Sequence, residues 1–109
     1  MGLDIDISRR TANICPHCGK IIEYKVVDCE ESGGRAWYPF LESIGYYVPY
    51  DQRTEENDWY CKDMTLTAEQ TLELYRFLMK ADVYNGLSIK NMVASALLEE
   101  ATIVVNANW

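Results

Sequence analysis

Apolar and polar residues alternate strictly near the start of the chain, in residues 3–7. A period of two is typical of a strand with one buried face, so Leu3, Ile5 and Ile7 are expected to face the core. Residues 20–27 are rich in β-branched and aromatic side chains and predict a second strand. The segment between the two strands is expected to join them as a long hairpin.

Apolar residues recur at helical spacing in three later segments. Residues 35–44 predict a short helix. A capping box that begins at Thr67 opens a longer amphipathic helix, which is expected to stop at Asn85. Ser88 is expected to cap a third helix. Residues 102–106, of which the first four are β-branched, predict a last strand, which could pair beside the first one.

Two segments are expected to be loops. Residues 29–34 are polar and end in two glycines, and residues 46–62 show no period. A loop as long as the second is uncommon in a compact domain unless it has a function or is anchored to the rest of the fold. Cys61, near its end, is the residue expected to anchor it. The order of elements predicts a single α+β domain over residues 1–109, with a small antiparallel sheet of about three strands and three helices packed on one face.

The run Cys15-Pro16-His17-Cys18-Gly19 carries the most specific chemical signal in the chain. Two thiolates separated by two residues can bind one metal ion from a single turn. The proline presets φ for that turn, and the glycine supplies the positive φ needed to leave it. Backbone N–H groups in such a turn point at the sulfurs. The run therefore predicts a zinc knuckle between the first two strands. A redox dithiol is the weaker alternative, because it needs a helix start after the first cysteine.

A structural zinc site needs four ligands, and the sequence leaves two of them open. Cys61 is the preferred third ligand and Cys29 the fourth. An unbroken second strand would place Cys29 roughly 30 Å from the knuckle. The alternatives are His17, Asp58 and Asp63. Four protein ligands leave no open position for water, so the expected Zn²⁺ is structural rather than catalytic.

Composition narrows the function further. With 109 residues and 49% hydrophobic residues, the chain can build a core, and its net charge is −7. This balance argues against a protein that grips nucleic acid through phosphates, and it favours a basic protein partner or simple solubility. His17 is the single histidine, and no phosphate-binding glycine motif is present, so no enzyme activity is expected. A signal peptide and a membrane-length apolar run are not apparent, which predicts a cytoplasmic protein.

Acidic residues gather in residues 51–73, which carry a net charge of −5 and include a tryptophan and a tyrosine. Such a segment suits a docking surface for a basic protein, and the alternative is a solvated loop with its aromatic residues turned inward. The residues expected to contact a partner are Asp51, Glu55, Glu56, Asp58, Trp59, Tyr60 and Asp63.

Three stretches, residues 1–7, 36–41 and 97–105, resemble small proteins of bacteriophages and prophages. Within that group, a compact acidic chain with a zinc knuckle is similar to the anti-CRISPR proteins, and in particular to a zinc-containing inhibitor of the type II effector nuclease. The resemblance implies a protein that binds the effector in the host cytoplasm and blocks DNA loading or cleavage. We expect the chain to be a monomer or weak dimer. Alternatives are another phage accessory protein, acting in the virion or on transcription, and a zinc-ribbon nucleic-acid binder.

Overall fold

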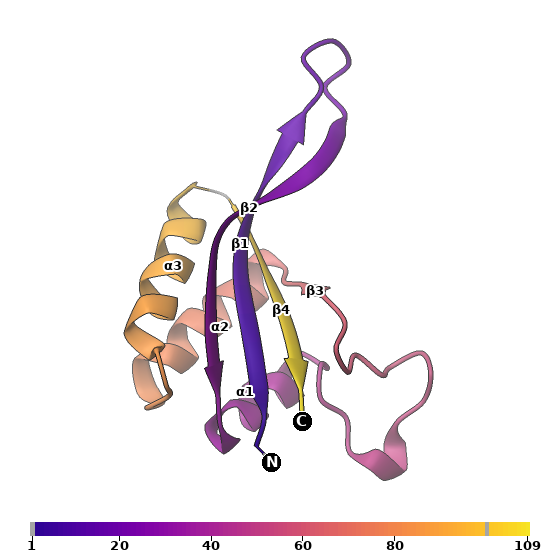
Figure 1. The fold of residues 1–109 in the computed structure, drawn as a ribbon, viewed down its shortest axis with the longest axis vertical. Helices are drawn as coiled ribbons and strands as arrows, with labels where there is room; N and C mark the ends of the chain where they lie inside the picture. Colours follow the sequence, from indigo (N-terminus) through magenta and orange to yellow (C-terminus); the bar gives the residue numbers. More distant parts are fainter. Residues whose placement is uncertain (1, 100) are drawn as a thin grey trace.

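The computed structural model describes residues 2–99 and 101–109, with the backbone alone described at 12–14 and 21–24. Its elements in chain order are β1 (Asp4–Ile14), β2 (Ile21–Gly33), the 3-10 helix η1 (Arg35–Trp37), α1 (Tyr38–Ser43), the 3-10 helix η2 (Tyr50–Gln52), β3 (Met64–Thr65), α2 (Ala68–Lys80), α3 (Gly86–Glu99) and β4 (Thr102–Asn108). The helices lie against one face of a single sheet (Figure 1). The predicted α+β class is confirmed.

The sheet is antiparallel and has the strand order β2-β1-β4-β3. β1 is therefore an inner strand, with Asp4 opposite Gly33 on one side and opposite Asn108 on the other. The expected pairing of the C-terminal strand beside the N-terminal strand is confirmed. β2 is the long edge strand, and the two-residue β3 forms the other edge.

The core lies between the inner sheet face and the helices. Leu3, Ile5 and Ile7 are buried there, as their alternation predicted. The helices contribute Trp37, Leu41, Leu74, Ile89 and Val93, and β4 contributes Ile103 and Val105. The capping box at the start of α2 is confirmed, since the Thr67 side chain accepts a hydrogen bond from the third helical residue and the reciprocal bond is also present.

Several boundaries differ from the predictions. Residues 29–34, expected to be a loop, continue β2 as far as Gly33, because the first residues of β1 pair with them. β1 likewise runs on to Ile14. β3 was not predicted, because its two residues are extended only through their pairing with β4. α2 ends at Lys80, before the expected stop at Asn85, and α3 begins at Gly86 rather than after Ser88.

Candidate functional site

β1 and β2 continue as a two-stranded hairpin beyond the edge of the four-stranded sheet (Figure 1). β4 pairs with β1 only from Asp4 to Arg10, whereas β2 pairs with it as far as Ile14. The register shifts between Arg9 and Arg10 and leaves Val27 as the extra residue of a bulge. A bulge bends and twists the strand that carries it. It lies where the hairpin leaves the sheet, so it helps to set the direction of the projection.

Arg9 fixes the base of this projection to the body of the protein. Its guanidinium pairs with Asp28 of β2 and, at 2.9 Å, with Glu99 at the end of α3. The Arg9 side chain is only 13% exposed, so these charge-assisted hydrogen bonds are partly shielded from water. Three elements are thereby held together at the point where the hairpin emerges.

The hairpin ends in a turn made by residues 15–20, called the tip below. The Cys15 N–H donates to the Lys20 carbonyl at 2.8 Å, and the Gly19 N–H donates to the Cys15 carbonyl at 3.0 Å. Gly19 has φ 72°, a left-handed conformation that a glycine adopts without strain. The predicted hairpin connection and the predicted positive φ of its glycine are both confirmed.

Both cysteines of the tip are free thiols, and Cys18 is exposed. The backbone N–H groups of His17 and Cys18, followed by the Cys18 thiol, lower the pKa of Cys15. A lower pKa favours the thiolate, which is the form that binds metal ions and attacks electrophiles. The tip can therefore offer two sulfur ligands to one ion from a short, hydrogen-bonded turn.

The other two cysteines lie in the body of the protein. Cys29 is opposite Ser8 in the β1–β2 register. Ser8 lies seven residues before Cys15 along β1, which corresponds to about 23 Å of extended strand. Cys61 donates its N–H to the Ala107 carbonyl at 2.9 Å. Ala107 pairs near the opposite end of β1, so Cys61 lies still farther from the tip, at about 33 Å by the same measure.

The aspartates considered as alternative ligands also lie in the body. Asp58 accepts the Tyr60 N–H at 3.1 Å, and Asp63 accepts bonds from Arg10 and Asn106. Leaving out residues 12–14 and 21–24, whose side chains are not described, no three His, Cys, Asp or Glu side chains of residues 2–99 and 101–109 are grouped so that they could hold a metal ion. The expected set of four thiolates around one ion is therefore not assembled within a single chain.

The residues expected to bind a partner all lie in residues 51–63, called the acidic loop below. Arg53 organises the start of this loop, donating to the Val48 carbonyl at 2.9 and 3.2 Å. Its guanidinium also lies over the rings of Tyr47 and Trp109, at 5.7 and 5.3 Å from their centroids. Cation–π contacts of this kind stabilise a loop without any regular backbone pairing.

Two of the expected contact residues form an exposed turn. Glu55 and Glu56 lie between Thr54 and Asn57, which bond each other reciprocally: the Thr54 N–H donates to Asn57 Oδ1 at 2.7 Å, and the Asn57 N–H donates to Thr54 Oγ1 at 3.3 Å. Asp51, in η2, is exposed as well. The loop therefore presents three carboxylates to solvent on an internally bonded backbone.

The aromatic residues of the loop divide between core and surface. Trp59 is half-buried and packs beside Tyr46, with ring centroids 6.3 Å apart. Tyr60 is 43% exposed and meets the edge of Trp109 at 5.0 Å. Trp59 is therefore mainly a packing residue, while Tyr60 is available to a partner.

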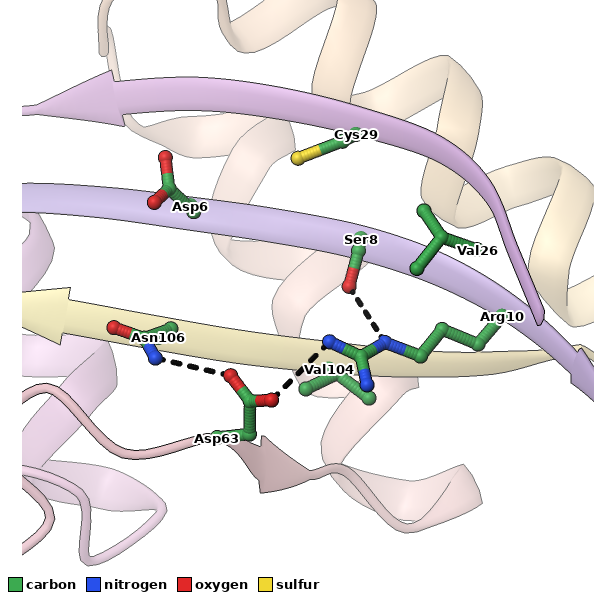
Figure 2. Close-up of a pocket in the computed structure, with 8 residues that line it drawn as sticks. All are labelled: Asp6, Ser8, Arg10, Val26, Cys29, Asp63, Val104 and Asn106. Carbon is green, nitrogen blue, oxygen red and sulfur yellow. Dashed lines mark hydrogen bonds and ion pairs between the residues drawn. The ribbon is translucent and has the colours of Figure 1, made fainter. Parts of the chain in front are cut away.

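Asp63 belongs to a polar network on the sheet face away from the helices (Figure 2). Arg10 Nη2 lies 3.3 Å from Asp63, and its Nε donates to Ser8 Oγ at 3.1 Å. The side chain of Asn106 donates to Asp63 at 3.0 Å. The Asp63 side chain is 52% exposed, but its carboxylate is already engaged within the chain, so a partner would have to compete with Arg10 and Asn106 for it.

The same face carries a shallow cavity of about 270 Å³. Its lining includes Cys29, Asp6 and Val26 beside the network just described (Figure 2). Burial, followed by the nearby charge of Asp6, raises the pKa of the Cys29 thiol. A raised pKa keeps this thiol protonated at neutral pH, where it is a poor nucleophile.

Sequence reasoning missed the role of Arg53. In the sequence it counts only as one positive charge among many negative ones. Val48 and Tyr47 are near Arg53 in sequence, but Trp109 lies 56 residues further along, so no local pattern could have indicated that contact. The network around Asp63 was missed for the same reason, because it joins β1, β4 and the loop.

No protein family matches the chain, and no match was found among curated proteins or among solved structures. In the part of the chain that the structure describes, none of the helices is both long enough and apolar enough to cross a membrane.

Proposed function

We propose that this chain is a non-enzymatic binding protein that docks a basic protein through the acidic loop. The observation that carries the proposal is the exposed trio Asp51, Glu55 and Glu56 on a loop with an ordered backbone. Complementary charge speeds association with a basic surface and selects against acidic ones. A loop that is already ordered also loses less conformational entropy on binding.

The resemblance to anti-CRISPR proteins suggests which basic partner to test first. A type II effector nuclease holds nucleic acid in a positively charged channel. An acidic loop that occupies part of that channel would compete with DNA for the same lysines and arginines. We therefore propose a phage-derived inhibitor that acts in the host cytoplasm by blocking DNA loading or cleavage.

The proposal includes a structural zinc ion at the tip, with Cys15 and Cys18 as ligands. Its support is the geometry of the tip, where two free thiols separated by two residues lie on a turn closed by backbone hydrogen bonds. A tetrahedral zinc ion takes four ligands, so two positions are open to groups from outside this chain. The ion would hold the turn in a fixed shape and supply no reactive water.

The experiment is an inhibition assay with a matched pair of charge-reversal variants. Purified effector nuclease is titrated with the wild-type chain, with Glu55→Lys/Glu56→Lys, and with Glu42→Lys/Asp82→Lys. All four substituted residues are exposed, and the two variants change the net charge equally. The concentration needed for half-maximal inhibition should rise at least tenfold more for the loop variant than for the control. Raising the salt concentration should weaken inhibition by the wild-type chain.

An equal loss of inhibition in the two variants would show that inhibition depends only on the net charge of the chain. That result would refute the acidic loop as the docking surface. Absence of inhibition by the wild-type chain, together with no effector recovered in a pull-down, would refute the proposed partner. A shift of DNA or RNA in a gel by the chain alone would favour the nucleic-acid binder instead. A pull-down that recovers a virion or transcription protein would favour another phage accessory role.

A further inference from the structure

We propose that two copies of this chain share one zinc ion at their tips, with each copy supplying Cys15 and Cys18. The inference rests on the proposed zinc binding at the tip and adds the identity of the partner that completes the site. The resulting centre has four thiolates, the ligand set of a closed structural zinc site. The site is incomplete in one chain and complete in two.

The ligand count leads to this arrangement. Along β1, the register places Cys29 about 23 Å and Cys61 about 33 Å from the tip cysteines. Cys29 cannot reach the ion while β1 and β2 are paired, and Cys61 cannot while it is bonded to Ala107 of β4. Among the described side chains, which exclude those of residues 12–14 and 21–24, no third His, Cys, Asp or Glu is grouped with two others as a metal site. A zinc ion held by the two tip thiolates has two coordination positions left, which the same two cysteines of a second molecule can fill.

The shape of the protein gives a second copy access to the tip. Beyond Arg10 the hairpin has no further β4 partner and stands clear of the helices (Figure 1). The five residues from Arg10 to Cys15 correspond to about 16 Å of strand. Two tips can therefore meet end to end while the two bodies remain about 30 Å apart by the same geometry.

Charge favours the same end-to-end arrangement. The chain carries a net charge of −7, but residues 11–25 hold Lys20 and Lys25 against a single glutamate. Four thiolates and one Zn²⁺ have a combined charge of about −2. Lysines on both hairpins lie close in sequence to that centre and offset its charge. The acidic bodies are separated by more than the Debye length of about 8 Å at physiological ionic strength, so their repulsion is largely screened.

Symmetry explains why the partner is a second copy. A two-fold axis through the ion brings the same Cys15–Cys18 pair from each chain to opposite sides of the metal. Two such pairs, rotated relative to each other, give tetrahedral coordination. The interface is small and consists largely of the metal site, so we expect the dimer to dissociate when the metal is removed.

The experiment measures zinc content and mass together. The wild-type chain is freed of metal under a non-thiol reductant, titrated with zinc, and examined by elemental analysis and sedimentation. Binding should saturate at one zinc per two chains, with a dimer forming in step and reverting to monomer on addition of EDTA. Small-angle scattering should give a maximum dimension of about twice the 48 Å length of one chain.

Cobalt titration and cysteine variants identify the ligands. Co²⁺ in place of zinc should give the intense charge-transfer bands of a tetrahedral tetrathiolate site, saturating at half an equivalent. Cys18→Ser should abolish both these bands and the dimer, whereas the matched controls Cys29→Ser and Cys61→Ser should retain them. Circular dichroism of each variant checks that the body is folded.

The possible failures are distinguishable. One zinc per chain on a monomer would overturn the shared site but leave zinc binding at the tip intact. No stoichiometric zinc would overturn both. A dimer that persists in EDTA, or cobalt bands that survive Cys18→Ser, would overturn the sharing of metal through these residues.

Discussion

The Tyr46 hydroxyl ties the long loop to the sheet, and its removal gives a quantitative test of the fold. It accepts the Ala107 N–H at 2.7 Å and donates to the Lys62 carbonyl, also at 2.7 Å. The adjacent Cys61 N–H donates to the Ala107 carbonyl. Tyr46 and Cys61 thus provide hydrogen-bond partners for the backbone N–H and carbonyl of Ala107, on the outer edge of β4 beyond the end of the short β3.

The variant Tyr46→Phe removes the hydroxyl and keeps the ring. Tyr46 and Ala107 are both 0% exposed, so the Ala107 N–H would be left buried without a partner. Leaving a buried donor unsatisfied costs about 1–3 kcal/mol. Lys62 is exposed, so its carbonyl can turn to water, and we expect the total loss to remain within that range.

The assay is urea unfolding of the wild-type chain, Tyr46→Phe and the control Tyr47→Phe. The hydroxyl of Tyr47, a half-buried residue, makes no hydrogen bond with other residues in the described part of the chain. The control should therefore change the free energy of unfolding by less than about 0.5 kcal/mol. A loss as small for Tyr46→Phe as for the control would refute the argument that this hydroxyl serves as a sheet partner.

Alkaline pH tests the same group independently. Burial raises the pKa of the Tyr46 phenol above 10, and this effect outweighs the hydrogen bond from Ala107, which lowers it. The folded state therefore holds the phenol neutral, while the unfolded state ionises it as the pH passes 10. This contribution to stability is complete below pH 10 and is lost as the pH rises towards the folded-state pKa. In Tyr46→Phe, the part of the alkaline destabilisation that comes from this group should disappear.

Three further predictions concern other parts of the chain. Thr67→Ala removes the N-cap of α2 and should cost about 1 kcal/mol in urea unfolding, with Thr67→Ser restoring most of it. Gly33→Ala places a Cβ 2.5 Å from the Leu3 carbonyl oxygen, so it should destabilise by about 1–3 kcal/mol, whereas an unchanged midpoint would contradict the close approach. In the metal-free reduced chain, Cys15 should be alkylated faster than Cys29 at neutral pH, because its pKa is lowered while that of Cys29 is raised; mass spectrometry of the labelled peptides would show the order.

The features that the sequence predicted well are those encoded within a few residues. The alternation of Leu3, Ile5 and Ile7 specifies which strand face is buried. The capping box at Thr67 and the glycine at the end of the tip each depend on contacts within their own turn. Such signals survive folding because tertiary contacts reinforce them.

The features that could not be predicted depend on distant pairing. Residues 29–34 have the composition of a loop, yet Gly33 is the last residue of β2 because β1 supplies its partners. β3 is extended only because β4 is beside it, and Arg53 meets Trp109 only in the folded chain. Charge and spacing could identify the acidic loop but not its internal bonds, and they could not show that Asp63 is already engaged.

The position of Cys29 connects the fold to the proposed metal chemistry. If residues 29–34 formed a loop, Cys29 could be free to approach the tip and complete a site within one chain. In the structure, Cys29 instead lies within β2 and pairs with Ser8 of β1. The continuous strand extends the hairpin away from the body. The same pairing that removes Cys29 as a ligand therefore carries the tip, with the half-buried Cys15 and the exposed Cys18, away from the body to a place that another molecule can approach. On this reasoning, a variant that breaks the strand near Cys29 could gain an intramolecular ligand only by losing the projection that makes a shared site accessible.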